Sequence, residues 1–179
     1  MQVTNLSEKF KDIKIAKGIF FEDDRGSLKK TIYGDNLDIL MSSIKEVICS
    51  RSNKNVIRGL HFQTKPAEIS KFITCVSGKI IDVFLDIRVD SKTFGQYASI
   101  ELQENDDTAI FIPKGFAHGY GVLSKEATVV YLQSGNFDTN NDFAINPLSL
   151  GIDWGIKDPK ISSKDANAIS FQEFKKNIN

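Results

Sequence analysis

Histidine and cysteine are scarce in this sequence, with two of each among its 179 residues. Cys49 and Cys75 belong to neither a CxxC pair nor a Cys/His cluster, so no zinc site is indicated and we expect two reduced, buried thiols. His61 and His118 lie far apart in the chain, whereas a metal site inside a β-barrel of the cupin type usually has two histidines one residue apart on a strand. We therefore predict no metal; a site of both histidines and one carboxylate is the alternative.

The sequence also lacks a charge bias and a long apolar run. Lys plus Arg equals Asp plus Glu, at 23 each, which argues against a nucleic-acid partner but allows a local basic pocket for a small anion. No stretch approaches the roughly 18 apolar residues that span a bilayer, and the first fifteen residues contain no signal-peptide core. We expect a cytoplasmic protein without a membrane partner. No linker rich in Gly, Pro or Ser divides the chain, so residues 1–179 are predicted to form one domain.

What the sequence has in abundance is short runs of Ile, Val, Phe and Thr, broken by Gly, Asp, Asn and Ser. Many short strands at close spacing favour an all-β sandwich or barrel. Helical signals are few and predict short helices over 36–43 and 163–174. The runs predict strands over 13–21, 44–50, 56–63, 71–76, 79–88, 97–102, 108–112 and 128–132.

Residues 79–88 alternate between two kinds of side chain, as a strand with two different faces does. One set is aliphatic, and the other mixes an aromatic ring with charges: Ile81, Val83, Leu85 and Ile87 against Asp82, Phe84, Asp86 and Arg88. The first face belongs in a core. The second is typical of the wall of a wet cavity, with a solvent-facing strand surface as an equal alternative.

The segment around His61 contains a glycine where a regular strand would not need one. Arg58 and His61 are three residues apart, so an unbroken strand would point them to opposite faces. A glycine inside a strand often marks a bulge that redirects side chains, and Gly59 would then let both converge on one pocket. A lone histidine in a strand is more often structural than catalytic, so this convergence is the condition for a functional reading.

Four stretches carry the most specific pattern: NVIRGLHFQ, SKFITCVSGKIIDVFLDIRVDSKTFG, IFIPKGFAHGYGVLS and LGIDWGI. Together they resemble the dTDP-4-dehydrorhamnose 3,5-epimerase family over nearly the whole chain. The resemblance implies a cupin-like jelly roll without a catalytic metal or cofactor, a homodimer, and a nucleotide-linked 4-keto-6-deoxy sugar as substrate. His61 is implied to be the base, Asp165 its partner, Tyr131 the acid and Lys71 a further catalytic residue. Substrate-binding roles are implied for Arg25, Arg58, Gln63, His118 and Phe137.

These residue types suit proton transfer next to a ketone. A C4 ketone acidifies the hydrogens at C3 and C5, and histidine has the near-neutral pKa that a base for such a proton needs. An aspartate on the other ring nitrogen fixes the tautomer. We expect Lys71 to stabilise the enolate oxygen and Tyr131 to protonate the opposite face. Arg58 and His118 would hold sugar or diphosphate oxygens. Pattern alone favours a buried strand aromatic for Tyr131 and an exposed charge for Asp165.

The match departs from the family pattern on the nucleotide side. The early D.RG.F.E pattern places Leu28 at the aromatic position and Lys30 at the acidic position. Our hypothesis is that the sugar chemistry is retained while the nucleotide or the sugar differs from dTDP-4-keto-6-deoxyglucose. Alternatives are an epimerase for C3 only or C5 only, a related 3,4-ketoisomerase, and a non-catalytic jelly roll that binds a sugar nucleotide.

Overall fold

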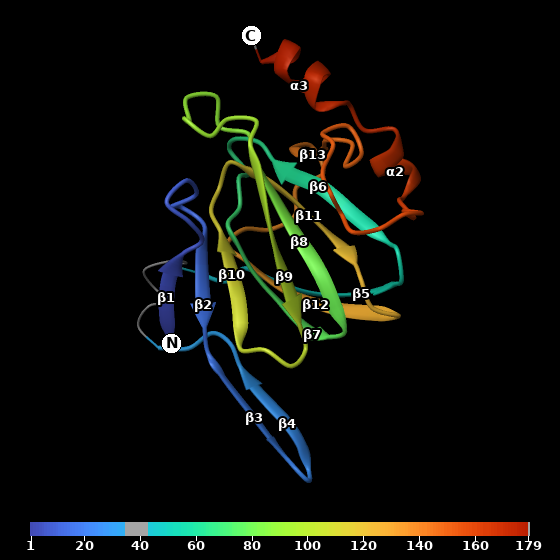
Figure 1. Ribbon diagram of the computed structural model, residues 1–179. Coiled ribbons are helices and arrows are strands. Elements are labelled where there is room, and N and C mark those ends of the chain that lie inside the picture. The colour runs from blue at the N-terminus through green and yellow to red at the C-terminus, as the bar shows by residue number, and fades with distance from the viewer. Residues whose placement is uncertain (35–42, 179) are drawn as a thin grey trace.

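The computed structural model describes residues 1–34 and 43–178, and its two large antiparallel sheets pack face to face (Figure 1). The six-stranded sheet has the order β1 (Gln2–Asn5), β2 (Lys14–Lys17), β10 (Thr108–Ile112), β7 (Lys71–Ser77), β12 (Glu126–Gln133) and β5 (Glu46–Asn53). The five-stranded sheet has the order β13 (Asp142–Ala144), β6 (Ile57–Gln63), β11 (Phe116–Val122), β8 (Lys79–Asp86) and β9 (Tyr97–Gln103). This is the predicted all-β jelly-roll sandwich.

The main hydrophobic core fills the space between the two sheets. Ile73 and Ile110 enter it from the six-stranded sheet, and Phe84 and Tyr120 enter it from the five-stranded sheet; all four are fully buried. Burying one such side chain contributes roughly 1.5–3 kcal/mol. The sandwich is therefore held together by the inward face of each sheet.

A second core covers the outer face of the five-stranded sheet. Trp154 and Phe171 of the C-terminal segment pack there against buried strand residues such as Leu60 and Val83. The segment carries α2 (Ser163–Ala166) and α3 (Phe171–Asn177), drawn in red beside β6 in Figure 1. Its packing brings α2 against the strand that carries His61.

Several strands match the predicted ranges closely, but three predictions need correction. The helix predicted over 163–174 is two short helices with separate caps, Ser162 and Ser170. Strand β11 was not predicted, and Cys49 is exposed rather than buried. The helix predicted over 36–43 lies almost wholly outside the described residues. In the part of the chain that the structure describes, no helix is long and apolar enough to cross a membrane.

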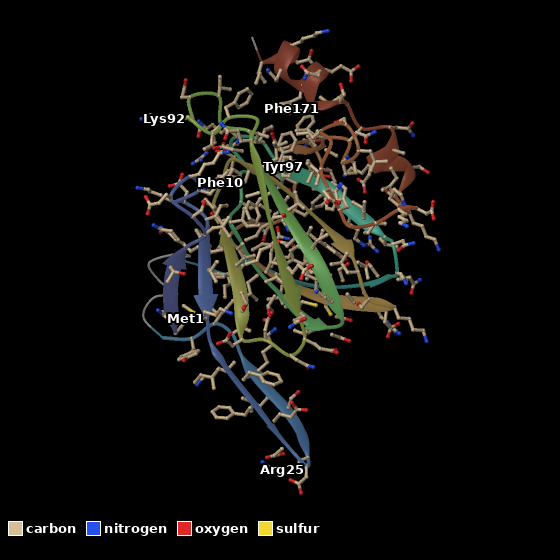
Figure 2. The ribbon with its side chains drawn as sticks, viewed as in Figure 1. Met1, Phe10, Arg25, Lys92, Tyr97 and Phe171 are labelled. Carbon is tan, nitrogen blue, oxygen red and sulfur yellow. The ribbon has the colours of Figure 1, made fainter. Side chains whose placement is uncertain are left out.

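The strand predicted over 13–21 breaks at Gly18, and its second half forms a projecting hairpin. A Cβ at Gly18 would lie 2.0 Å from the carbonyl oxygen of Lys30, so only glycine fits at this crossing. The hairpin, β3 (Ile19–Asp23) and β4 (Gly26–Lys30), extends away from the sandwich, and Arg25 lies at its tip (Figures 1 and 2). Lys29 ties it to the body by donating hydrogen bonds to the carbonyl oxygens of Cys75 and Gln103.

The alternating strand over residues 79–88 is β8, and both of its faces are covered. Val83 and Leu85 face the outer core, as predicted. The other face contacts the sandwich interior, where Asp82 and Asp86 are fully buried. The solvent-facing alternative is therefore wrong, and Asp82 is placed to act inside the protein.

Candidate active site

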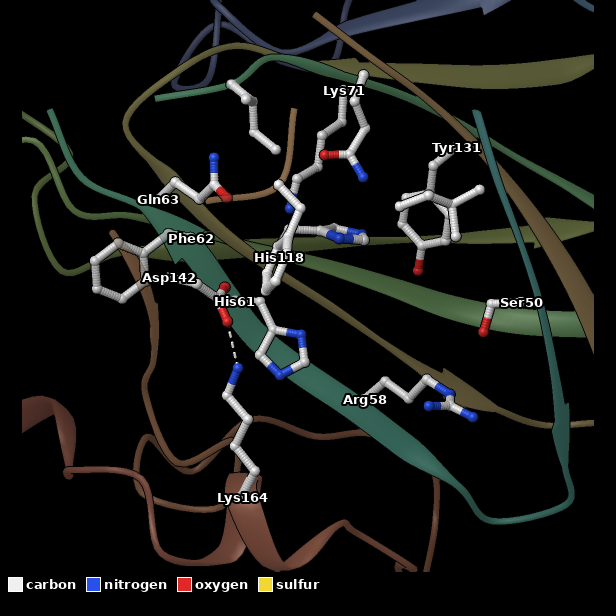
Figure 3. A pocket seen from close by; sticks show the side chains of 14 residues that line it. Ser50, Arg58, His61, Phe62, Gln63, Lys71, His118, Tyr131, Asp142 and Lys164 are labelled. Carbon is white, nitrogen blue, oxygen red and sulfur yellow. Dashed lines mark hydrogen bonds and ion pairs between the residues drawn. The ribbon is translucent and has the colours of Figure 1, made fainter. Parts of the chain in front are cut away.

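One end of the sandwich contains a cavity of about 280 Å³ whose walls come from both sheets (Figure 3). The five-stranded sheet and the six-stranded sheet face each other across it, and the loop after β12 and helix α2 close its rim. The lining residues that the following paragraphs use are Ser50, Arg58, His61, Gln63, Lys71, His118, Tyr131, Phe137, Asp142 and Lys164.

Strand β6 carries a bulge that aims two of these side chains into the cavity. His61 pairs with His118 of β11, while Arg58 pairs with Tyr120, so β6 has one more residue than β11 over this span. Gly59 takes up the extra residue with φ of 131°, and a Cβ there would lie 2.5 Å from the Cα of Gly119. The predicted convergence of Arg58 and His61 on one pocket is confirmed.

His61 forms a close pair with an aspartate from the C-terminal segment. Its Nε2 lies 2.6 Å from Oδ1 of Asp165, which is buried in the first turn of α2. Burial alone would raise the pKa of Asp165, but hydrogen bonds from His61, Ser162 and the Gly59 N–H lower it below its usual value. An ionised Asp165 accepts a hydrogen bond from the Nε2–H group of His61, which leaves the Nδ1 lone pair of His61 free to act as a base.

His118 also forms a pair with an aspartate, deeper in the fold. Its Nε2 lies 2.8 Å from Oδ1 of Asp82, and both side chains are buried. The pKa of His118 lies below its ordinary value, because burial, Lys71 and His61 all lower it against the opposing effect of Asp82. His118 is therefore a neutral ring that donates to Asp82 from Nε2, and its Nδ1 is an acceptor. An acceptor suits a sugar hydroxyl and does not suit a phosphate oxygen.

Lys71 and Tyr131 reach the cavity from the six-stranded sheet, opposite His61 and His118. Burial lowers the pKa of Lys71 to about 8, with Asp142 and Asp82 acting in the opposite direction. Burial raises the pKa of Tyr131 well above its usual value, helped by Tyr120 and Asp82 and opposed by Arg58. At neutral pH, Lys71 is mostly a cation and Tyr131 is a phenol with a proton to give.

The structure separates the remaining predicted substrate ligands. Phe137 lines the cavity from the loop after β12. The amide of Gln63 also lines it but is already engaged: its nitrogen donates to the carbonyls of Ala67 and Asn136, and its oxygen accepts from the Asp138 N–H. Gln63 therefore holds the loop that carries Phe137. Arg25 lies outside this cavity, because it sits on the projecting hairpin and pairs with Asp23.

Two charged lining residues were not among the predicted site residues. Lys164 of α2 and Asp142 of β13 form an ion pair at the cavity rim, which Figure 3 shows beside His61 and Phe62. Lys164 directly precedes Asp165 in the chain, so the same turn presents the cation at the rim and the carboxylate behind His61. Within residues 1–34 and 43–178, no group of three or more His, Cys, Asp or Glu side chains is placed to hold a metal ion.

Comparison with known proteins gives a consistent result. A family model described as dTDP-4-dehydrorhamnose 3,5-epimerase matches residues 7–173. The enzyme of that name from Mycobacterium tuberculosis is 37% identical over 165 residues, which cover 88% of this chain and 78% of the relative. A dTDP-4-dehydrorhamnose 3-epimerase from Streptomyces niveus is 36% identical over 126 residues, covering 69% of this chain and 61% of the relative.

A solved structure is similar over almost its full length. It is the dTDP-6-deoxy-D-glucose-3,5-epimerase from Legionella pneumophila in complex with dTDP-4-keto-L-rhamnose. The TM-score is 0.87 at 31% identity, and the match covers 96% of this chain and 93% of the other.

Proposed function

We propose, because this chain belongs to the dTDP-4-dehydrorhamnose 3,5-epimerase family, that His61 is the base with which it epimerises a nucleotide-linked 4-keto-6-deoxy sugar at C3, C5 or both. Epimerisation of a nucleotide-linked sugar is the activity of the family, and the chain is an isomerase. The observation that supports the assignment is the His61–Asp165 pair at 2.6 Å, which faces Tyr131 and Lys71 across one cavity.

The first step removes a proton from a carbon next to the C4 ketone. Nδ1 of His61 takes the proton, and the electron pair of the C–H bond moves onto the carbonyl oxygen to give an enolate. Asp165 stabilises the imidazolium that forms, because it is ionised and accepts from Nε2. The Lys71 ammonium offers the enolate oxygen a charged donor, an interaction worth about 100- to 1,000-fold in rate at comparable sites.

The second step returns a proton to the opposite face of the sugar ring. Tyr131 approaches the cavity from the six-stranded sheet, whereas His61 approaches it from the five-stranded sheet (Figure 3). The enolate carbon, C3 or C5, takes the phenolic proton of Tyr131 and so acquires the inverted configuration. The C4 ketone is restored in the same step. Donation by Tyr131 from the other wall is what converts simple proton exchange into epimerisation.

The diphosphate and the nucleotide are proposed to lie toward the rim. Arg58 carries a guanidinium fork that suits phosphate oxygens, and Lys164 adds a second cation at the rim, where it pairs with Asp142. Phe137 is exposed on the rim loop and offers a ring for stacking on a base. His118 accepts a hydrogen bond from a sugar hydroxyl through Nδ1.

We propose that the active form is a homodimer in which the projecting hairpin contacts a second copy. The hairpin exposes Phe21 and Leu28 together with Arg25, a combination that a lone subunit leaves in water. Phe21→Ser with Leu28→Ser should shift the protein to monomer in size-exclusion chromatography with light scattering. Leu148→Ser, at another exposed leucine, is the control. A monomeric native protein would refute the dimer.

A cytoplasmic location also stays a prediction.

Proton exchange in D₂O tests the catalytic proposal against the alternative of a sugar-nucleotide-binding jelly roll. With dTDP-4-keto-6-deoxyglucose, an epimerase incorporates deuterium at the inverted carbon, and a binder incorporates none. NMR at C3 and C5 separates inversion of both carbons from inversion at C3 alone, which the name of the Streptomyces niveus relative keeps as the second candidate. The absence of exchange at both carbons, with dTDP-4-keto-6-deoxyglucose and with the 4-keto-6-deoxy sugar of any other nucleotide that binds, would refute the proposal.

The identity of the nucleotide needs its own experiment. The hairpin carries Leu28 and Lys30 where the family pattern has an aromatic and an acidic residue, and Lys30 lies over the ring of Tyr33 at 4.7 Å. We propose that this changes nucleotide or sugar preference. Calorimetric binding of dTDP, CDP, GDP and UDP is the measurement. A clear preference for dTDP would contradict a changed nucleotide.

A further inference from the structure

A second phenol lies next to the cavity and is connected to it by hydrogen bonds. Tyr120 of β11 is fully buried, and its hydroxyl lies 3.0 Å from Oγ of Ser50 and 2.9 Å from Oγ of Ser52, both on β5. Nε of Arg58 donates to Oγ of Ser52 at 2.8 Å. Arg58, Ser52, Tyr120 and Ser50 therefore form one unbroken chain that joins the two sheets.

The arginine end of this chain has a fixed hydrogen-bond direction, and one choice of donors continues that direction along the whole chain. Arg58 has only protons to donate, so Ser52 accepts from it. Either oxygen can donate between Ser52 and Tyr120, and in the direction that continues from Arg58 the buried Ser52 donates to Tyr120. Tyr120 then donates to Ser50, and the Ser50 hydroxyl is left to donate into the cavity that it lines. The guanidinium at one end thus polarises three hydroxyls toward the other end.

The inner end of the chain lies beside the proposed acid. Ser50 and Tyr131 line the same cavity from the neighbouring strands β5 and β12, and the rings of Tyr120 and Tyr131 have centroids 6.4 Å apart. The outer end is Arg58, which also borders a second depression on the protein surface with Lys160 and Ser162. The chain therefore runs from the surface side of β6 to the wall that carries Tyr131.

One inversion leaves protons on the wrong groups. His61 holds the proton taken from carbon, and Tyr131 is a phenolate after donating its own. His61 returns its proton to solvent, because its side chain is partly exposed. Tyr131 is also only partly buried, but it lies on the wall across the substrate from His61. It must be reprotonated before it acts again, and twice per substrate if C3 and C5 are both inverted.

We propose that the Ser52–Tyr120–Ser50 chain is a proton relay that reprotonates Tyr131, so that Tyr120 is a positioning residue of the reaction. The Ser50 hydroxyl proton is delivered into the cavity toward the phenolate, the Tyr120 proton moves to Ser50, and the Ser52 proton moves to Tyr120. Water on the Arg58 side replaces the proton of Ser52, and Arg58 keeps its own. In total one solvent proton enters and one leaves from His61. The relay rests on the proposed acid role of Tyr131.

The test separates proton removal from inversion. In D₂O with dTDP-4-keto-6-deoxyglucose, NMR reports total deuterium exchange, which needs His61, and the inverted fraction, which needs a ready Tyr131. Tyr120→Phe keeps the ring and breaks the chain. We expect it to lower the inversion-to-exchange ratio by about tenfold, a part of the 100- to 10,000-fold that general acid–base catalysis contributes. Ser50→Ala should act likewise, and Tyr97→Phe on β9 is the matched control.

The outcomes distinguish the relay from its premise. An unchanged ratio in Tyr120→Phe and Ser50→Ala, or equal losses of exchange and inversion, would overturn the relay and leave Tyr120 a structural role. The premise is checked by Tyr131→Phe, which should lose inversion and keep exchange. If Tyr131→Phe inverts normally, the proposed acid is wrong and the relay falls with it. Melting temperatures of all variants confirm that they are folded.

Discussion

The cavity wall contains two histidine–aspartate pairs side by side, and they differ mainly in burial. His61 and His118 face each other on adjacent strands, and each bonds an aspartate through Nε2, at 2.6 and 2.8 Å. The His61 side chain is 37% exposed, whereas the His118 side chain is 4% exposed. The same two residue types thus form an accessible pair and an enclosed pair within one wall.

The difference shows how burial divides the work between similar groups. His118 stays neutral at pH 7 because burial, Lys71 and His61 together lower its pKa against the opposing effect of Asp82. A group whose pKa is lowered is a weaker base but a constant hydrogen-bond partner. His61 meets the cavity and solvent, so it can take a proton from the sugar and release it to water. We therefore assign the base to the accessible pair and a ground-state contact to the enclosed pair.

The largest expected effect comes from exchanging the two histidines separately for asparagine. His61→Asn should lower deuterium incorporation at C3 and C5 by about 10,000-fold, because it removes the base. His118→Asn should lower it by about tenfold, the effect of one lost hydrogen bond. Exchange rates by NMR give both numbers. Equal losses in the two variants would show that burial does not separate the roles.

The aspartates should differ in the same way. Asp165→Asn removes the charge that supports the imidazolium and permits the wrong tautomer, so we expect kcat to fall by about 1,000-fold. In Asp82→Asn the new amide faces the His118 ring, which stays neutral, so we expect kcat to fall by only about tenfold. Steady-state kinetics measure both. A larger loss for Asp82→Asn would reverse the assignment of the two pairs.

Burial also affects Lys71, whose charge influences both the reaction and the free energy of unfolding. Lys71→Met should lower kcat by about 100-fold, because it removes a charged donor to the enolate. Because burial lowers the pKa of Lys71 from 10.5 to about 8, its charge disfavours the folded state below pH 8, and this cost fades as pH rises from 8 to 10.5. The variant should therefore be more stable at pH 7, by about 1–3 kcal/mol at most.

Urea unfolding at pH 7 and pH 10 measures this effect of Lys71. The stability gain of Lys71→Met should be smaller at pH 10, and a gain that is independent of pH would contradict the linkage. The pKa of His118 should also rise in the variant, because Lys71 is one of the groups that lower it. Histidine NMR titration follows this change.

The smallest expected effect is on the pH profile of the native enzyme. The activity that depends on the Lys71 cation should fall to half near pH 8 and by about tenfold for each further pH unit. Arginine stays charged throughout this range, so Lys71→Arg should lose the falling limb even if its rate is lower. A falling limb that is unchanged in Lys71→Arg would assign it to another group.

Strand alternation and the motif resemblance predicted the fold class and the family. The face expected to be a wet cavity wall instead packs inside the sandwich, where Phe84 belongs to the main core and Asp82 is fully buried. Strand β11 escaped prediction because Gly119 and Gly121 are weak strand formers, and their reason appears only in the fold. A Cβ at Gly119 would lie 2.5 Å from the carbonyl of Arg58, and one at Gly121 would meet Ile156 and Trp154. Local propensity does not record such close approaches between distant segments.

The site could be predicted in its chemistry but not in all its contacts. The convergence of Arg58 and His61 followed from one glycine in a strand. The engagement of Gln63 and the ion pair of Lys164 with Asp142 depend on how a loop, β13 and α2 meet, which no single segment encodes. The motif does not say how the hairpin points, so it did not show that Arg25 lies outside this chain's own cavity, and a substrate-binding role for Arg25 stays a prediction.

The crossing of Gly59 and Gly119 has a consequence for anyone who redesigns this enzyme. Two backbones touch there without intervening side chains, so the spacing between the arginine and the histidine on β6 is set by contact rather than by any functional group. Alanine at either position would push the strands apart and swing both side chains at once. A mutational library aimed at new sugars should therefore leave Gly59 and Gly119 unchanged and vary residues at the cavity rim instead.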